Sequence, residues 1–105
     1  MAAVVALVSD LMLSSRVQGA LTAAGHEVSV KAVPDAETAD ADLIVADLEA
    51  VDPAAVVALG PPTLGFYSHV DVDTRRVAEA AGFDQVVPRS RMARELPELV
   101  ERLLA

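Results

Sequence analysis

ADLIVADL, residues 41–48, is the stretch of sequence from which the fold can be inferred. Its centre is continuously apolar, which is typical of a strand that has helices on both faces. A second run of this kind, AAVVALV at residues 2–8, ends at the polar pair Ser9 and Asp10. Because strands covered on both faces occur mainly in parallel sheets, the two runs predict the centre of a parallel α/β sheet.

The sequence between these two runs predicts a helix, an edge strand and a short helical segment. Residues 27–33 alternate apolar and polar side chains, which indicates an edge strand with one wetter face. Pro34–Asp40 has room for one or two helical turns at most. Apolar residues at helical spacing, followed by Gly25 as a helix end, predict a helix over residues 12–24: Leu13, Val17, Leu21 and Ala24.

The second half of the chain continues the alternation of helices and strands. Pro53 starts a short apolar helix, which Gly60-Pro61-Pro62 ends. TLGFYS at residues 63–68 predicts a fourth strand, after which Asp71 or Asp73 can cap a further helix. The order of elements is therefore that of repeated strand–helix units.

The C-terminal part is predicted to hold a fifth strand and a last helix. The strand, residues 84–88, ends in Pro88, which cannot donate to a ladder and so fits a sheet edge. The last helix is predicted to start at Pro97, since proline fits a first turn, with Ser90–Glu95 as a loop or a separate turn.

This alternation predicts one domain over residues 1–105, with right-handed crossovers and helices on both faces of the sheet. The alternating second strand and the proline-bearing fifth strand are the natural edges, which gives the order 2-1-3-4-5. That order is a flavodoxin-like three-layer α/β/α sandwich, whose crevice lies beyond the carboxyl ends of strands one and three. The predicted strands are residues 2–8, 27–33, 42–48, 63–68 and 84–88.

Composition excludes several classes of function. The net charge of −8 argues against direct binding of nucleic acid. The absence of cysteine removes disulfides, thiolate catalysis and cysteine-bound metals, and is compatible with the cytoplasm. The apolar run at residues 2–8 is too short for a membrane span and has no basic flank, so we expect neither a signal sequence nor membrane association.

Asp10 and Asp47 follow the two central strands, so the predicted topology brings their carboxylates to the same edge of the sheet. Convergent carboxylates are typical ligands of hard cations such as Mg²⁺. The alternative is that Asp10 caps the first helix and that Asp47 turns a loop.

Four segments resemble the strand ends of response regulator receiver domains, and together they cover nearly the whole chain: ALVSDL, DLIVADL, GFYSH and AGFDQVVPRS. This resemblance implies that Asp47 is the phosphoacceptor and Asp10 an acidic metal ligand. It also implies that Arg89 stands where the family has lysine, and that Tyr67 or Ser68 supplies the hydroxyl of the family's Thr or Ser.

The same resemblance implies a protein partner such as a histidine kinase, and Mg²⁺ held by Asp10, Asp47 and the backbone carbonyl of Glu49. Departures from the family pattern bear on this chemistry. Ser9 replaces one acidic residue, the residues after Asp47 differ, Val86 replaces an aromatic residue, and the second and third helices are short.

The sequence is compatible with several functions. A receiver phosphorylated at Asp47 and a phosphorylation-independent pseudo-receiver both act by protein–protein contact and are not enzymes. A dimerisation scaffold and a small-ligand binder are the other candidates, although the chain has few aromatic residues and no glycine-rich phosphate loop. His26 and His69 are interpreted as ordinary strand and loop residues.

The predicted partner or homodimer face comprises the fourth helix, the fifth strand and the last helix. Basic and acidic residues gather in this part of the chain and could form reciprocal ion pairs across a two-fold axis: Arg75, Arg76, Arg89, Arg91, Arg94, Glu95, Glu98 and Glu101.

Overall fold

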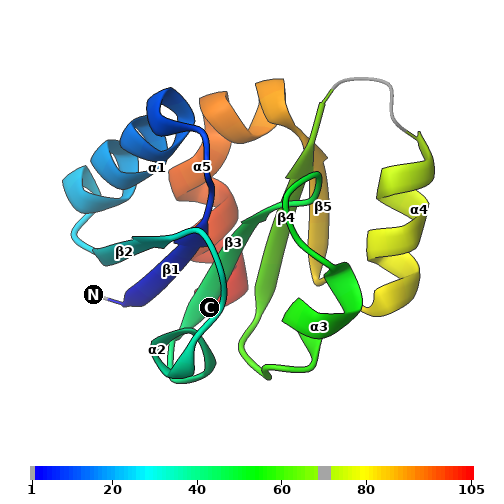
Figure 1. The fold of residues 1–105 in the computed structure, drawn as a ribbon. Coiled ribbons are helices and arrows are strands. Elements are labelled where there is room, and N and C mark those ends of the chain that lie inside the picture. The colour runs from blue at the N-terminus through cyan, green and yellow to red at the C-terminus, as the bar shows by residue number, and fades with distance from the viewer. Residues whose placement is uncertain (1, 69–71) are drawn as a thin grey trace.

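Five parallel strands form one sheet in the order β2-β1-β3-β4-β5 in the computed structural model, which describes residues 2–68 and 72–105 (Figure 1). The predicted pairing and strand order are confirmed, and each strand is shorter than predicted by one or two residues at one or both ends. The strands are β1 (Ala3–Leu7), β2 (Glu27–Lys31), β3 (Leu43–Asp47), β4 (Thr63–Tyr67) and β5 (Gln85–Pro88).

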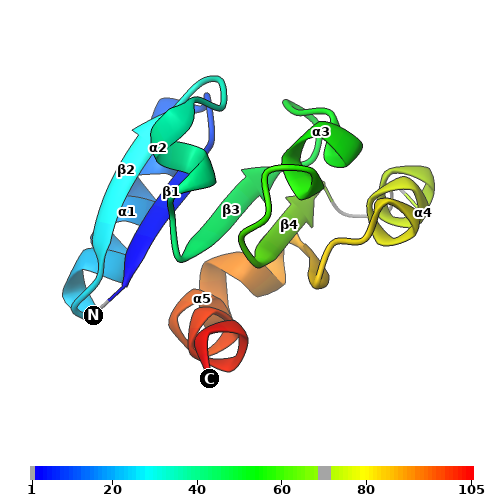
Figure 2. The same cartoon turned by 90° about the horizontal axis from the view of Figure 1, so that it is seen from below.

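Five helices in the described part of the chain cover the two faces of this sheet. One face carries α1 (Leu11–Ala23) and α5 (Arg89–Leu104), and the other carries α2 (Ala36–Ala39), α3 (Pro53–Val57) and α4 (Val72–Ala81). Figure 2 shows α3 and α5 on opposite sides of β3 and β4. None of the helices in the described residues has the length and apolar character needed to span a bilayer.

The alternation of side chains along each strand divides the interior into two cores. Val4 and Ala6 of β1 pack into the core beneath α1 and α5, which we call the first core. Val5 and Leu7 pack into the second core, beneath α3 and α4. Since successive side chains of a strand point to opposite faces, continuously apolar strands are what a sheet with two cores requires.

Helix α5 corrects one expectation from the sequence, because it begins at Arg89 and continues through Pro97. The side chains of α5 that are buried in the first core lie on both sides of the proline in the sequence: Met92, Leu96, Leu99 and Val100. A proline inside a helix costs about 3 kcal/mol. Burial of Met92 and Leu96 contributes roughly 1.5–3 kcal/mol each, which offsets that cost and keeps the segment before Pro97 helical.

The start of α4 is only partly described. Asp73, one of the two residues predicted to cap this helix, lies inside its first turn. The other, Asp71, lies outside the described residues, as does His69.

Gly65, in the middle of β4, is where the segment after β3 packs onto the sheet. A Cβ at this position would lie 2.9 Å from three side-chain carbons of Leu48. Leu48 is itself buried in the second core, so its side chain occupies the space that any larger residue at position 65 would need. The glycine therefore allows the residue directly after Asp47 to lie against the sheet.

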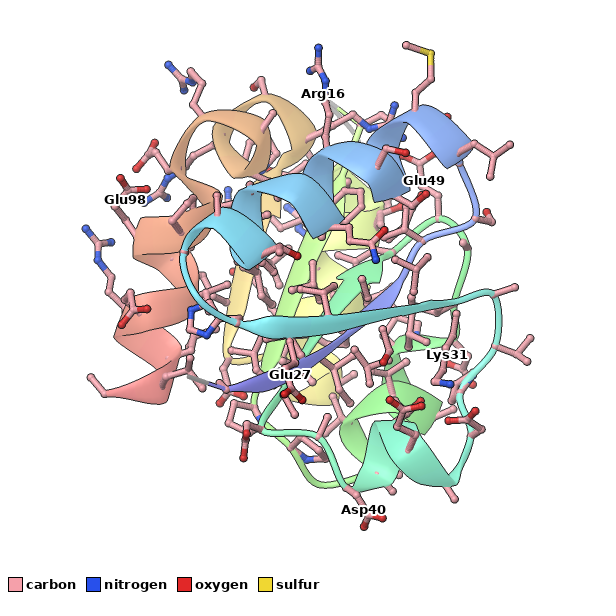
Figure 3. All side chains as sticks on the ribbon, turned by 90° about the vertical axis from the view of Figure 1, so that its left-hand side faces the viewer. Arg16, Glu27, Lys31, Asp40, Glu49 and Glu98 are labelled. Atoms are coloured by element: carbon pink, nitrogen blue, oxygen red, sulfur yellow. The ribbon has the colours of Figure 1, made fainter. Side chains whose placement is uncertain are left out.

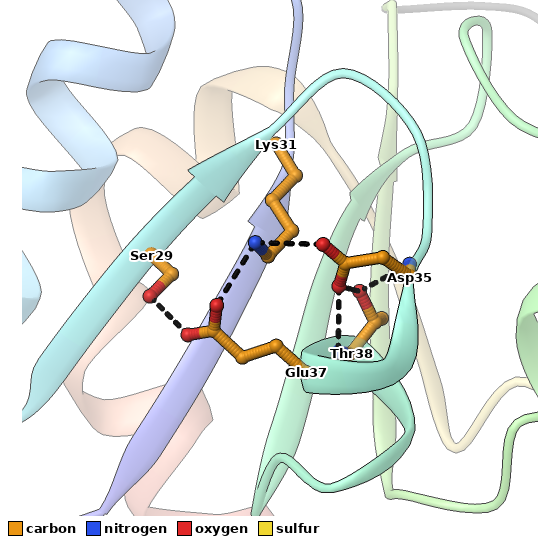
Figure 4. A network of polar contacts seen from close by, with 5 residues as sticks. All are labelled: Ser29, Lys31, Asp35, Glu37 and Thr38. Carbon is orange, nitrogen blue, oxygen red and sulfur yellow. Dashed lines mark hydrogen bonds and ion pairs between the residues drawn. The ribbon is translucent and has the colours of Figure 1, made fainter.

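Lys31, at the end of the edge strand β2, holds the short helix α2 against the sheet (Figure 4). Its ammonium lies 2.9 Å from carboxylate oxygens of both Asp35 and Glu37. The Ser29 hydroxyl donates to Glu37 at 2.6 Å, and Asp35 and Thr38 form a capping box at the start of α2. Hydrogen bonds to Glu37 and then Asp35 raise the pKa of Lys31.

The same contacts lower the pKa of both carboxyl groups. The hydrogen bond from Lys31 is the main cause at Asp35, and the hydrogen bond from Ser29, followed by that from Lys31, is the cause at Glu37. Charged edge-strand residues of this kind also discourage pairing with another chain.

We predict that Gly65→Ala lowers the free energy of unfolding by about 1–3 kcal/mol, because the new methyl group must displace Leu48. Gly19→Ala is the matched control. Gly19 lies within α1, and a Cβ added there would have open space around it, so alanine should raise stability by about 0.5–1 kcal/mol. Urea unfolding measures both, and a neutral or stabilising Gly65→Ala would contradict the close packing.

We predict that the contribution of Glu37 to stability disappears in acid. A carboxyl group with a lowered pKa stabilises the fold above its ordinary pKa, here 4.5, and loses this contribution as the pH falls through its lowered value. Glu37→Gln should therefore be less stable than the wild type at about pH 7 and should converge with it progressively as the pH falls from about 7 to about 2.

Urea unfolding across this pH range tests the convergence. Glu27→Gln, in the same sheet edge, is the control, because Glu27 makes no ion pair in the part of the chain that the structure describes. A difference between Glu37→Gln and the wild type that is constant over this range would show that the ion pair does not stabilise α2.

Candidate functional site

Asp47 is the last residue of β3 and is only 7% exposed. Leu43 and Val45 of the same strand point into the first core, so strand alternation directs Asp47 to the α1 and α5 face. Its Oδ1 accepts a hydrogen bond from the backbone N–H of Glu49 at 3.0 Å. The carboxylate is thus held at the carboxyl edge of the sheet, where the sequence predicted a crevice.

Asp10 caps α1, as one of the two interpretations of the sequence expected. Its backbone is extended, and its Oδ1 accepts from the N–H of Leu13 at 2.9 Å. Asp10 is exposed and lines a surface hollow together with Arg16 and Arg89.

Glu49 ties together the two loops that follow β3 and β4. Its Oε1 accepts from the backbone N–H of Ser68 at 2.8 Å and also from the Ser68 hydroxyl. Ser68 directly follows β4, so this side chain links neighbouring strand ends that are 19 residues apart in the sequence. The sequence suggested Glu49 only for its backbone carbonyl, and the role of its side chain was missed.

Tyr67 and Ser68 lie on opposite sides of the sheet. Tyr67 is buried in the second core, whereas Ser68 lines a cleft on the α1 and α5 face. Because the two residues are adjacent at a strand end, their side chains alternate in direction. Of the two candidate hydroxyls, the structure therefore places that of Ser68 on the same face as Asp47.

Arg89 is the first residue of α5 and is exposed at the rim of this cleft, which has a volume of about 380 Å³. The described lining residues are Leu13, Arg16, Ser68, Arg89, Ser90 and Ala93. Arg16 and Ser90 were not predicted as site residues. Their signal in the sequence was weak: Arg16 is three residues after Leu13, and so shares a helix face with it, and Ser90 follows Arg89.

The carboxylates at this edge fall short of a complete metal site in the part of the chain that the structure describes. Within residues 2–68 and 72–105, no three His, Cys, Asp or Glu side chains are grouped so that they could hold a metal ion. Oδ1 of Asp10 caps α1, and Oδ1 of Asp47 accepts from the N–H of Glu49. Mg²⁺ binding therefore stays a prediction.

His26 lies at the opposite, amino-terminal edge of the sheet and is buried. Its Nδ1 accepts from the N–H of Ala2 at 3.2 Å, and its Nε2 lies 3.1 Å from Glu101 Oε1. These contacts join the start of the chain to α5. The sequence interpretation of His26 as an ordinary strand residue did not include them, and the residue directly precedes β2.

No protein-family model matches the sequence, and no curated protein is a significant match. Solved structures do match. The receiver domain of the TMAO respiratory system response regulator TorR is 24% identical with a TM-score of 0.81, over 97% of this chain and 95% of that one. Vibrio cholerae chemotaxis protein CheY4 is 20% identical with a TM-score of 0.80, over 99% of each chain.

NtrX from Brucella abortus is 19% identical with a TM-score of 0.83, over 98% of this chain. This chain spans only 26% of the length of NtrX. Identities this low establish the fold alone. The chain has the CheY-like, flavodoxin-like fold of response regulator receiver domains.

We predict that Glu49→Ala lowers the free energy of unfolding by roughly 1–2 kcal/mol, because both contacts to Ser68 are lost. Ser68→Ala keeps the backbone contact and should cost roughly 0.5–1.5 kcal/mol. The double variant should be little less stable than Glu49→Ala, since the two residues act as one unit. Additive effects would contradict this coupling, and Glu98→Ala, an exposed substitution on α5, should change stability by less than about 0.5 kcal/mol.

Proposed function

We propose that this chain is an atypical receiver-type signalling domain of the cytoplasm, which acts by contact with a partner protein and accepts a phosphoryl group on Asp47. The observation that carries the proposal is the position of Asp47. It is a nearly buried carboxylate at the end of the central strand of a CheY-like fold, on the face where Arg89 and Ser68 line a cleft.

The chemistry proposed at Asp47 is in-line displacement on a phosphohistidine of a histidine kinase. Oδ1 is engaged by the Glu49 N–H, so Oδ2 is the attacking oxygen. The new O–P bond forms as the P–N bond breaks, and the imidazole leaves with a proton from solvent. Arg89 would neutralise charge on the phosphoryl oxygens, although its planar guanidinium presents donors differently from the family's lysine.

Mg²⁺ is the cofactor that the resemblance implies for this reaction, with Asp10, Asp47 and the Glu49 carbonyl as ligands. In support, Asp10 and Asp47 follow the adjacent strands β1 and β3 at one edge of the sheet. Against it, Oδ1 of Asp10 already accepts from the N–H of Leu13. A test of phosphorylation therefore needs arms with and without Mg²⁺.

A phosphorylation-independent pseudo-receiver is the second candidate, and the Glu49–Ser68 contact favours it. In that contact the carboxylate of Glu49, a residue of the chain itself, already accepts from the donors of Ser68 and holds the loops after β3 and β4 together. Such a domain would present the same surface to its partner without an added phosphoryl group.

The partner or homodimer face is proposed to comprise α4, β5 and α5. Two of its arginines already form ion pairs within their own helices, Arg75 with Glu79 at 3.5 Å and Arg91 with Glu95 at 3.4 Å. Exposed pairs of this kind contribute little to stability and can be exchanged for pairs across an interface. They would contribute specificity more than affinity.

Incubation with acetyl phosphate, with and without Mg²⁺, followed by mass spectrometry of the intact chain and its peptides tests the phosphoacceptor role. We expect one phosphoryl group on the peptide that contains Asp47, absent from Asp47→Asn and present in Asp40→Asn. Asp40 is an exposed aspartate near the opposite end of the molecule and serves as the control (Figure 3). An unmodified wild type in both arms would contradict phosphorylation and leave the pseudo-receiver.

A further inference from the structure

Arg16 of α1 and Arg89 of α5 line the same two adjoining hollows at the carboxyl edge of the sheet. One is the cleft of about 380 Å³, which also has Ser90 in its wall. The other is more open and is bordered by Asp10 and Met12. A volume of this size lies at the lower end of the range for small-molecule sites, about 300–1,000 Å³.

The charge of the cleft is unusual for this chain, which has 16 acidic residues and 8 basic ones. Lys31, Arg75 and Arg91 each form an ion pair with a nearby carboxylate. Arg16 and Arg89 form none in the part of the chain that the structure describes, and the same is true of Arg76, Arg94 and Arg102. What distinguishes Arg16 and Arg89 is that both line one cleft, and Figure 3 shows Arg16 directed outward from α1. Two guanidinium groups on one small cleft make it locally positive, and this favours binding of an anion there.

The donors of the cleft suit a tetrahedral dianion better than a single carboxylate. Each guanidinium presents parallel N–H donors that match two oxygens of a carboxylate or phosphate. A phosphoryl group has three terminal oxygens and nearly two charges, so it can engage both arginines, whereas one carboxylate satisfies one fork. The Ser90 hydroxyl adds a neutral donor to the wall.

Part of the remaining wall is apolar, because Leu13 and Ala93 also line the cleft, and the rest is Ser68, whose hydroxyl donates to Glu49. The apolar part gives the organic part of a ligand a surface to contact. Asp47 is not among the described residues that line this cleft.

We propose that this cleft is a binding site for a phosphate-type dianion, either inorganic phosphate or the phosphoryl group of a small phosphomonoester, held by Arg16, Arg89 and Ser90. The site goes beyond the proposed signalling function and does not require phosphorylation of Asp47. It would make occupancy of the α1–α5 cleft, beside the candidate phosphoacceptor, a second input to the same domain.

Calorimetric and NMR titrations at low ionic strength test the proposal, with inorganic phosphate, phenyl phosphate and acetate as the probes. We expect saturable binding of one phosphate-type anion per chain, with acetate weaker by at least about tenfold. Arg16→Gln and Arg89→Gln should each weaken binding by at least about tenfold, since each removes a charge-assisted contact. Arg76→Gln, an exposed arginine of α4, is the matched control and should bind like the wild type.

The two sources of the anion are separated by comparing the phosphate probes. Tighter binding of phenyl phosphate, with shift changes at Leu13 and Ala93, would identify a phosphomonoester site, and equal affinity would identify a free phosphate site. Asp47→Asn should bind phosphate as the wild type does, so failure of phosphorylation and failure of this site give different results. Absence of saturable binding, or equal binding by Arg16→Gln and Arg76→Gln, would overturn the proposal.

Discussion

Burial of both faces of β1 and β3 is the constraint on which the rest of this structure depends. Every residue of β3 is buried, as are Val4 to Leu7 of β1. Each large apolar side chain in such a strand contributes roughly 1.5–3 kcal/mol when it leaves water, so helices must cover both faces. Helices that cross over from the end of one strand to the start of the next make the strands parallel. The carboxyl ends of parallel strands, and the residues that follow them, then lie at one edge of the sheet.

The residues at that edge are held by contacts that local sequence patterns do not predict. Leu48 packs over Gly65 in the second core, while Glu49 reaches the loop after β4 and binds Ser68. The backbone after Asp47 is therefore pinned from both sides of the sheet. The loop after β3 is therefore attached to the sheet at two consecutive residues.

The continuity of α5 through Pro97 has a consequence for the site. If the last helix started at the proline, Arg89 and Ser90 would belong to a loop. Because burial of Met92 and Leu96 extends the helix back to β5, both residues are instead set on a rigid element facing α1. Arg16 and Arg89 line the same cleft because α1 and α5, which are far apart in the sequence, pack against each other.

The sequence by itself determined the parallel sheet, its order and the positions of Asp10 and Asp47, because apolar runs, helical spacing and turn residues are local signals. The extent of α5 was decided by tertiary burial, which outweighed the intrinsic cost of proline. Tertiary structure also decided between Tyr67 and Ser68, since the face on which a side chain lies depends on the strand's orientation in the sheet. The Glu49–Ser68 contact joins segments distant in the chain, and so does the cleft that Arg16 and Arg89 both line, because only the packed fold brings such groups together.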